Sequence, residues 1–345
     1  MYVSANTLLE GNNFYKGWFA FRGMDDAILI LADPKGNAWD FAKEVYEKLN
    51  SNSLRDRKYS LGEVEIVKFN DGELFVQILT NVRKKTCFFI HDSSMAPQDW
   101  TIALAEVNDA LMRSSARKVN NVLPYMKYSR QDRMTAPRTS ITASVVAGII
   151  SLRANRVITT DLHNPASTGA YDIPFDNLKA YPVIVGHLMN NYPDFLRNLA
   201  IVSPDVGSAD RAKSYAKRLG GSVAIVDKSR EKAGVVGAMT VIGDVEGKNV
   251  LIVDDMIDTA GTLCKAAEVL RKKGALKIWA AATHGLFSKD ALDKLRDSCL
   301  DKVIVTDSIP QKALDKIEVV SLTGLFAETI YRISHGQSVS ELFRN

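Results

Sequence analysis

Short apolar runs and longer amphipathic segments alternate along most of this 345-residue chain. The clearest example begins at residue 249. Val250 to Val253 form a four-residue apolar run rich in β-branched side chains, which is typical of a buried strand. Between residues 263 and 270, apolar side chains recur at the i, i+3, i+4 and i+7 spacing of a helix packed on one face, and Gly274 is placed to end it. The pattern predicts a strand, a turn and a helix in immediate succession.

The same alternation begins at Ala27 and predicts parallel sheets with helices on both faces. Three units recur in the same order in the two halves of the chain: 27–31 with 199–202, 86–90 with 249–253, and 157–161 with 303–307. Such a repeat indicates a duplicated domain. We therefore expect an α/β fold of two tandem Rossmann-like domains, at residues 26–180 and 181–345. An aromatic arm at residues 1–25, without clear periodicity, should pack on its own subunit or on a neighbour.

Composition narrows the function classes. The chain is 46% hydrophobic and 24% charged, as in soluble globular proteins, and its length suffices for two cores. The net charge of +4 is small for this length and gives no support for binding to nucleic acid or membranes. Three widely spaced cysteines favour a reducing compartment, and neither an 18-residue apolar run nor a basic-then-apolar leader is present. These features predict a cytoplasmic protein without a membrane span.

Candidate chemistry is concentrated directly after the predicted strand at 250–253. Two carboxylates are followed by small and hydroxylated residues, whose backbone amides suit a phosphate together with the amino end of the next helix. The carboxylates could accept hydrogen bonds from ribose hydroxyls or face a metal ion. An acidic pair alone is often only a strand end before an ordinary turn, but the full run predicts a sugar-phosphate site. Its residues are Asp254, Asp255, Asp258, Thr259, Ala260, Gly261 and Thr262.

Two segments of the first half could contact a nucleotide. Phe69 could stack on a purine whose amino group donates to Asp71 and Glu73, although such a segment is more often a plain turn between strands. A second segment follows an expected strand at 122–125 and could bind a polyphosphate, because a guanidinium matches phosphate oxygens; surface salt bridges are the alternative. It comprises residues 128–133 and places Arg130 and Arg133 three positions apart.

Candidate metal ligands and catalytic cations also follow predicted strands. His163 and Asp205 should lie at the carboxyl edges of the sheets, where α/β proteins bind ligands. Mg²⁺ bound to phosphates needs few protein ligands, whereas a lone histidine is usually a structural residue. Lys228 and Arg230 belong to a charged run that is ordinarily a solvated loop. A cationic lid over a phosphoryl-transfer site would have the same composition.

The acidic loop resembles the phosphoribosyl-diphosphate (PRPP) motif of the phosphoribosyltransferase fold, and the motifs together resemble the ribose-phosphate diphosphokinase (PRPP synthetase) family over residues 27–343. The resemblance implies two phosphoribosyltransferase-type domains, the first on the ATP side and the second on the ribose 5-phosphate side. It implies transfer of the β,γ-diphosphate of ATP to the 1-hydroxyl of ribose 5-phosphate, with Mg²⁺ and release of AMP. It also implies a homo-oligomer, commonly a hexamer, whose sites are completed across subunits.

The same resemblance assigns roles to the candidate residues. It implies that Phe69, Asp71 and Glu73 form an adenine pocket lent by a neighbouring subunit, and that Arg130, Gln131 and Asp132 form the ATP motif. His163 and Asp205 match the Mg²⁺ ligands, while Lys228 and Arg230 match the catalytic pair of a flexible loop. Asp254 and residues 258–262 match the ribose 5-phosphate site, and residues 337–343 are similar to the C-terminus of the family.

Three segments depart from the family pattern: residues 139–144, residues 164–169 and the aromatic arm. The first two correspond to segments that line a regulatory site for phosphate and ADP in the family. The resemblance therefore does not extend to activation by phosphate or inhibition by ADP.

Other functions remain as alternatives. A phosphoribosyltransferase that consumes PRPP would need one such domain, so the duplication disfavours it. Diphosphate transfer to a larger acceptor such as ADP-ribose stays open, because the sequence does not define the width of the pocket. A non-catalytic regulatory subunit should have lost catalytic elements, whereas His163, Asp205, Lys228, Arg230 and the acidic loop are all present.

Overall fold

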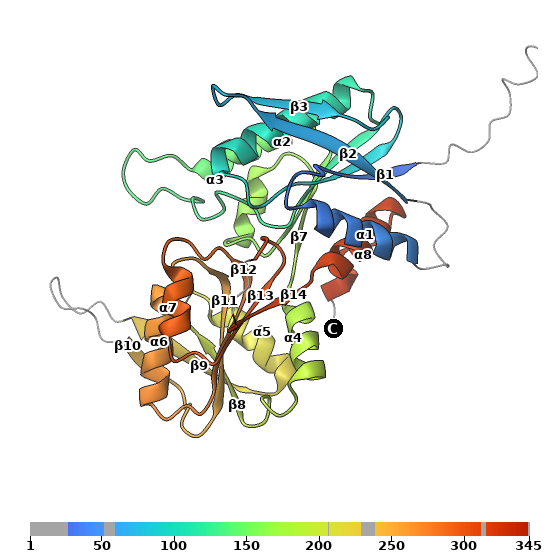
Figure 1. The fold of residues 1–345 in the computed structure, drawn as a ribbon. Helices are drawn as coiled ribbons and strands as arrows, with labels where there is room; N and C mark the ends of the chain where they lie inside the picture. The colour runs from blue at the N-terminus through green and yellow to red at the C-terminus, as the bar shows by residue number, and fades with distance from the viewer. Residues whose placement is uncertain (1–26, 52–58, 206, 229–238, 312–314, 344–345) are drawn as a thin grey trace, which may run out of the picture.

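The computed structural model describes residues 27–51, 59–205, 207–228, 239–311 and 315–343. Their strands form two seven-stranded sheets, one in each half of the chain (Figure 1). The aromatic arm lies outside the described residues. The change from the first sheet to the second falls between β7 and β8, and the division into domains at residue 180 stays a prediction.

The first sheet has the order β3-β2-β1-β4-β5-β6-β7. Its strands are β1 (Ile28–Ala32), β2 (Tyr59–Lys68), β3 (Leu74–Ile78), β4 (Thr86–Ile90), β5 (Lys118–Leu123), β6 (Arg156–Thr160) and β7 (Phe175–Leu178). The helices between them are α1 (Trp39–Ser51), α2 (Pro97–Arg113), α3 (Thr142–Ser151) and the 3₁₀ helix η1 (Pro165–Ala170). The strand expected at 122–125 is wrong at both ends, because β5 starts and ends earlier in register with β4 and β6.

The second sheet has the order β10-β9-β8-β11-β12-β13-β14, which is the first order with seven added to each strand number. Its strands are β8 (Leu199–Ser203), β9 (Ser222–Lys228), β10 (Met239–Ile242), β11 (Asn249–Ile257), β12 (Ile278–Gly285), β13 (Lys302–Thr306) and β14 (Ile317–Val320). The helices are α4 (Tyr181–Asn191), α5 (Ala209–Leu219), α6 (Gly261–Lys272), α7 (Ala291–Asp297), α8 (Thr323–Ser334) and the 3₁₀ helix η2 (Ser340–Phe343).

Both sheets are parallel except at one edge, where β2 pairs with β3 and β9 pairs with β10 in antiparallel fashion. The central strands β1, β8 and β12 are buried along their whole length. Parallel strands covered by helices on both faces read as continuous apolar runs, as the sequence does. The structure confirms the expected α/β fold and its duplication, with β1, β4 and β6 corresponding to β8, β11 and β13.

The last helix of the second half packs on the first helix of the first half. In Figure 1 the blue α1 and the red α8 lie side by side, and the rings of Phe41 and Phe326 pack edge to face with centroids 5.5 Å apart. The Thr323 hydroxyl donates to the Glu44 carboxylate at 3.1 Å. This contact holds the two halves together on one side of the molecule and leaves the carboxyl ends of both sheets facing each other.

None of the helices in the described ranges is both long and apolar enough to cross a membrane.

Candidate functional site

The predicted strand, loop and helix lie at the carboxyl edge of the second sheet. β11 continues through both carboxylates to Ile257, because it stays paired with β12 as far as Gly285. The strand therefore ends four residues later than the apolar run alone predicted. The turn is reduced to residues 258–260, and α6 begins at Gly261, inside the expected loop.

The turn and the amino end of α6 line a cavity of about 200 Å³, here called the loop cavity. Ala260 stands at the N-cap with φ 57°, in the left-handed region, and has no polar side chain to cap the helix. Gly261 adds no side chain either, and a Cβ there would meet no atom within 4 Å. An anion can therefore approach the amino end of the helix. Predicted residues that line the loop cavity are Asp205, Asp254, Asp258, Thr259, Ala260 and Thr262.

The two adjacent carboxylates have opposite electrostatic environments. Burial and a hydrogen bond with Asp255 raise the pKa of Asp254. Burial also acts to raise the pKa of Asp255, but hydrogen bonds with His163 and Asp254 lower it below its ordinary value. The His163 Nδ1 lies 2.8 Å from the Asp255 carboxylate, and this hydrogen bond raises the pKa of His163. One carboxylate of the pair is thus kept charged and the other can hold a proton.

His163 and Asp255 belong to a second cavity, of about 810 Å³, which we call the histidine cavity. It lies between the two halves of the chain, and Asp205, Ser208 and Arg211 line its other side. The Ser208 amide donates to Asp205 at 2.9 Å, so the side chain of Asp205 is fixed at the entrance to α5. The sequence-predicted residues His163, Asp205 and Asp255 are therefore brought together here.

A preformed metal cage is not present in the part of the chain that the structure describes, where no three His, Cys, Asp or Glu side chains converge in a suitable group. His163 and Asp205 line the same cavity, one from each half. Two such ligands fit Mg²⁺, which keeps several waters and takes further oxygens from phosphates. The assignment of His163 and Asp205 as Mg²⁺ ligands stays a prediction.

A third cavity, of about 720 Å³, also lies between the halves and is here called the tyrosine cavity. Tyr125, Tyr128, Arg130 and Gln131 line it from the segment after β5. The β4–α2 turn closes one side, and the loops after β12 and β13 close the other. Aromatic and aliphatic walls with two cationic side chains are suited to a nucleotide.

Direct contacts across the halves join these cavities. The Arg130 guanidinium lies 2.6 Å from the Asp258 carboxylate, which connects the predicted ATP motif to the predicted sugar-phosphate loop. The Thr283 hydroxyl donates to the buried Asp161 carboxylate at 2.7 Å. The neighbouring His284 ring lies against the backbone carbonyl of Thr160, with its Nε2 at 3.2 Å. The carboxyl ends of β6 and β12 are therefore hydrogen bonded to each other.

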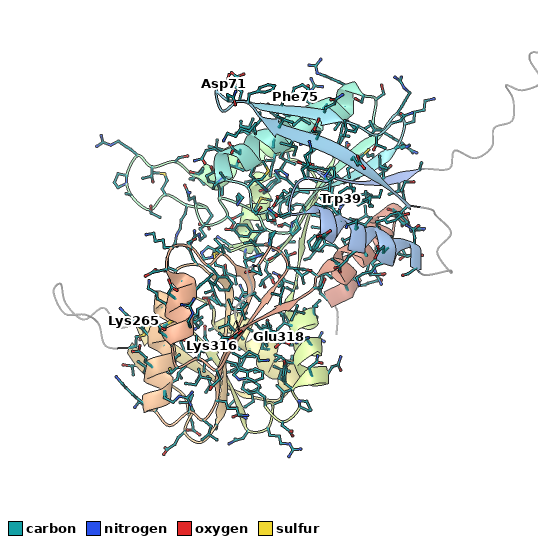
Figure 2. All side chains as sticks on the ribbon, in the orientation of Figure 1. Trp39, Asp71, Phe75, Lys265, Lys316 and Glu318 are labelled. Carbon is teal, nitrogen blue, oxygen red and sulfur yellow. The ribbon has the colours of Figure 1, made fainter. Side chains whose placement is uncertain are left out.

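Some predicted residues lie apart from these cavities. Phe69, Asp71 and Glu73 occupy the turn of the β2–β3 hairpin, where the Phe69 ring is 50% exposed. Figure 2 shows Asp71 and Phe75 at the outer tip of this hairpin, away from the second sheet. Their part in an adenine pocket of a neighbouring subunit stays a prediction.

The remaining predicted residues have different placements. Asp132 accepts a hydrogen bond from Asn164 at 2.6 Å, which ties the ATP motif to the divergent segment 164–169. Lys228 is the last residue of β9, and its side chain is outside the described part of the structure, as is all of Arg230. Their catalytic role stays a prediction.

Several site residues were missed by sequence reasoning. Arg211 lines the histidine cavity, and its charge lowers the pKa values of Asp254 and Asp255. Lys127 lines the tyrosine cavity, three residues before Arg130. Thr283 forms the bridge to Asp161. The position of Lys127 beside the ATP motif was the one available signal, whereas Arg211 and Thr283 sit in ordinary helix and strand patterns.

Comparisons with known proteins agree with this geometry. Residues 35–152 match the model of the N-terminal domain of ribose phosphate pyrophosphokinase, and residues 230–344 match the phosphoribosyl synthetase-associated domain. The ribose-phosphate pyrophosphokinase of Helicobacter hepaticus is 46% identical over 82% of this chain and 92% of its own length. That of Chromobacterium violaceum is 43% identical over 88% of this chain and 94% of its own length.

A solved structure gives the same result at the level of the fold. The phosphoribosylpyrophosphate synthetase from Mycobacterium smegmatis superposes with a TM-score of 0.80 at 30% sequence identity, covering 90% of this chain and 99% of its own. Both halves are included at that coverage, so the duplicated arrangement is shared. By sequence, by fold and by the residues that meet between its two sheets, the chain belongs to the ribose-phosphate pyrophosphokinase family.

Proposed function

We propose that this chain transfers the β,γ-diphosphate of ATP to the 1-hydroxyl of ribose 5-phosphate and so produces PRPP and AMP. The ribose 1-oxygen forms a bond to the β-phosphorus, and the bond from that phosphorus to the α,β-bridging oxygen breaks. AMP leaves with the bridging oxygen, and the hydroxyl releases its proton. Catalysis of this kind depends mainly on positioning and on charge stabilisation.

The loop cavity is the proposed site of ribose 5-phosphate. The amino end of α6 and the hydroxyls of Thr259 and Thr262 provide donors for the 5-phosphate. Asp254 lines the same cavity and can accept hydrogen bonds from ribose hydroxyls. Asp258 is paired with Arg130, so a sugar bound beside Asp258 would lie next to the first half of the chain.

The tyrosine cavity is the proposed site of ATP. Its aromatic walls suit the base and the ribose, while the Arg130 guanidinium faces both the cavity and the sugar-phosphate loop. The phosphate chain would then extend toward His163 and Asp205, which would hold Mg²⁺. The ion would neutralise charge on the transferred diphosphate. Lys228 and Arg230 are proposed to contact the same phosphates in the transition state.

The observation that carries this proposal is the ion pair between Arg130 and Asp258 at 2.6 Å. It brings the nucleotide side and the sugar-phosphate side within reach of one another, as a direct transfer requires. The two residues are 128 positions apart in the sequence and follow strands of different sheets. A chain that bound only one of the two substrates would not need this juxtaposition.

The test is to incubate the purified protein with ATP, Mg²⁺ and ribose 5-phosphate and to identify the products by mass. AMP and a sugar heavier by one diphosphate are expected. ADP would show single-phosphoryl transfer and would contradict the proposal. Product formation with ADP-ribose but not with ribose 5-phosphate would identify the larger acceptor. Absence of turnover with both acceptors would favour the regulatory-subunit alternative.

We further propose a homo-oligomer, with a hexamer as the expected form by family resemblance. The Phe69 ring and its hairpin are exposed and contribute to none of the three cavities above, which fits a loop lent to a neighbouring subunit. Dilution should therefore reduce specific activity as the oligomer dissociates. Light scattering and activity measured over the same dilution series test this, and a fully active monomer would contradict it.

A further inference from the structure

Lys127 is a partly buried cation that the proposed mechanism has not used. It follows β5 by four residues and lines the tyrosine cavity. Its ammonium lies 5.6 Å from the centroid of the Tyr125 ring, so the aromatic face holds it in place. Long cationic side chains usually extend into water, and this one instead stays within the cavity.

Lys127 has no ion-pair partner among the residues that the structure describes. The carboxylate that acts on it electrostatically is Asp92, and both of its oxygens are occupied. One accepts from the Ser94 amide at 2.8 Å and from its hydroxyl at 2.6 Å, and the other accepts from the Asn37 amide at 2.8 Å. Burial lowers the pKa of Lys127 to about 8, and the charge of Asp92 offsets only part of this effect.

The rest of the cavity is also prepared for an anion. Lys127 and Arg130 are the charged side chains in its lining, and the guanidinium is already paired with Asp258. Ser93, Ser94 and Ser288 add hydroxyl groups. The amino end of α2 opens on the same space without a capping side chain. Together these groups are complementary to a ligand with several negatively charged oxygens.

We propose that Lys127 binds a phosphate group of the nucleotide in the tyrosine cavity. This inference rests on the proposed function in one respect, the identity of the nucleotide as ATP. Lys127 is then a substrate-binding residue, distinct from the lid cations Lys228 and Arg230. In the empty enzyme a fraction of the Lys127 side chains is neutral. This reduces the electrostatic repulsion between Lys127 and Arg130 in the cavity.

The other titratable groups around Lys127 are His91, Asp92, Tyr125, Tyr128 and Arg130. From the end of β4, His91 is neutral because burial lowers its pKa to about 4, and Asp92 is an acceptor held by hydrogen bonds. On its own segment, burial raises the pKa of Tyr125, and hydrogen bonding and charge from Asp258 raise that of Arg130 against the effect of burial. The second half contributes non-titrating residues to the lining: Leu286, Ser288, Ile309 and Pro310.

Binding of ATP should therefore take up protons near pH 8. Titration calorimetry with an ATP analogue whose α,β-bridge is a methylene group, in Mg²⁺ buffers of different ionisation enthalpy, measures this uptake. We expect the part of this uptake that is due to Lys127, measured as the difference from Lys127→Met, to be about half a proton at pH 8 and close to none at pH 6.5, because at pH 6.5 Lys127 is already charged in the empty enzyme. The affinity should fall as the pH rises above 8.

Two variants separate charge from packing. Lys127→Met keeps the unbranched shape. It should remove the Lys127-dependent proton uptake and weaken binding of the analogue about tenfold, the scale of one charge-assisted hydrogen bond. Lys127→Arg should keep the affinity and lose its pH dependence, because guanidinium stays protonated. Lys277→Met, at an exposed lysine before β12, is the control and should change neither quantity.

The outcomes distinguish this inference from the proposed function. If wild-type protein forms AMP and PRPP but Lys127→Met retains both affinity and proton uptake, the inference is wrong and the function stands. If proton uptake depends on Lys127 while no AMP is formed, the inference holds and the proposed reaction is wrong. Should Lys127→Met fold poorly, a Lys127→Arg variant that keeps the wild-type pH dependence would overturn the inference.

Discussion

At the scale of single residues, Gly261 illustrates how α6 presents its amino end to a ligand. A Cβ at this position would point into open space, so no packing contact demands glycine. Its φ is not in the left-handed region, in contrast to that of Ala260 at 57°. Gly261 lies between Ala260 and Thr262, which line the loop cavity, so we expect a side chain here to hinder a phosphate at the amino end of α6.

Gly261→Ala should therefore weaken ribose 5-phosphate binding without harming the fold. We expect the KM for ribose 5-phosphate to rise about tenfold or more, while the melting temperature stays equal or increases, because alanine favours a helix over glycine. Gly324→Ala, near the start of α8, is a matched control where a Cβ also meets no atom within 4 Å. An unchanged KM in Gly261→Ala would contradict the phosphate site.

We predict that Lys228 acts mainly in the transition state. If it is a lid cation, Lys228→Ala should reduce kcat by about 100-fold or more, the effect of removing one preorganised donor, and should change ATP affinity only modestly. Steady-state kinetics and binding of a non-reacting ATP analogue measure the two effects separately. Equal losses in binding and turnover would argue against this role.

At the scale of elements, a polar network ties the outer edge of the second sheet to α4. Glu318 on β14 accepts hydrogen bonds at 2.6 Å from Lys302 on β13, from His187 on α4 and from Tyr192 just after that helix. Burial acts to raise the pKa of Glu318, but these hydrogen bonds lower it below its ordinary value. The charged carboxylate therefore stabilises the edge.

Glu318→Gln should lower the melting temperature at pH 7 by about 2–4 °C, the shift that roughly 1 kcal/mol produces in a domain of this size. A carboxylate with a lowered pKa stabilises the fold above its unfolded-state pKa, and this contribution is lost as the pH falls through the folded-state value. The difference between wild type and variant should thus shrink below about pH 4.5, the ordinary pKa of glutamate. Glu47→Gln, at an exposed position of α1, should cause no such change in thermal melts at either pH.

Element boundaries show where local sequence stops being informative. Residues 250–253 and the stripe at 263–270 predicted a strand and a helix, and both exist. The strand nevertheless runs on to Ile257, because hydrogen bonding to β12 continues past two carboxylates that interrupt the apolar run. Pairing with a strand 28 positions later, as in Val250 with Ile278, is not encoded in a short window of sequence.

At the scale of the whole molecule, the two sheets are linked at their carboxyl ends. Asp161 is buried and accepts from the Thr283 hydroxyl and from the Ala180 amide. Elsewhere between the two halves, α1 and α8 pack against each other. The relative position of the two proposed substrate sites therefore depends on these contacts between the halves.

Thr283→Val should loosen this link while preserving side-chain shape. We expect a loss of about 1–3 kcal/mol in the free energy of unfolding, because the buried Asp161 loses a donor, together with a lower kcat at saturating substrates. Thr329→Val in α8 is the control, since its hydroxyl donates within one helix, to the Leu325 carbonyl. Denaturant melts and kinetics test both, and equal loss of kcat in the two variants would show that the bridge has no special role.

The sequence by itself determined the fold class, the duplication and the succession of strand, turn and helix around the acidic pair, because each depends on contiguous residues with a characteristic period or spacing. Only the tertiary structure decided which of these motifs meet. Arg130 reaches Asp258, and His163 reaches Asp255, because the carboxyl edges of two separately encoded sheets face each other. The same packing places Lys127 without an ion-pair partner among the described residues. Burial and long-range pairing are properties of the assembled chain, so a local pattern could nominate these side chains but could not bring them together.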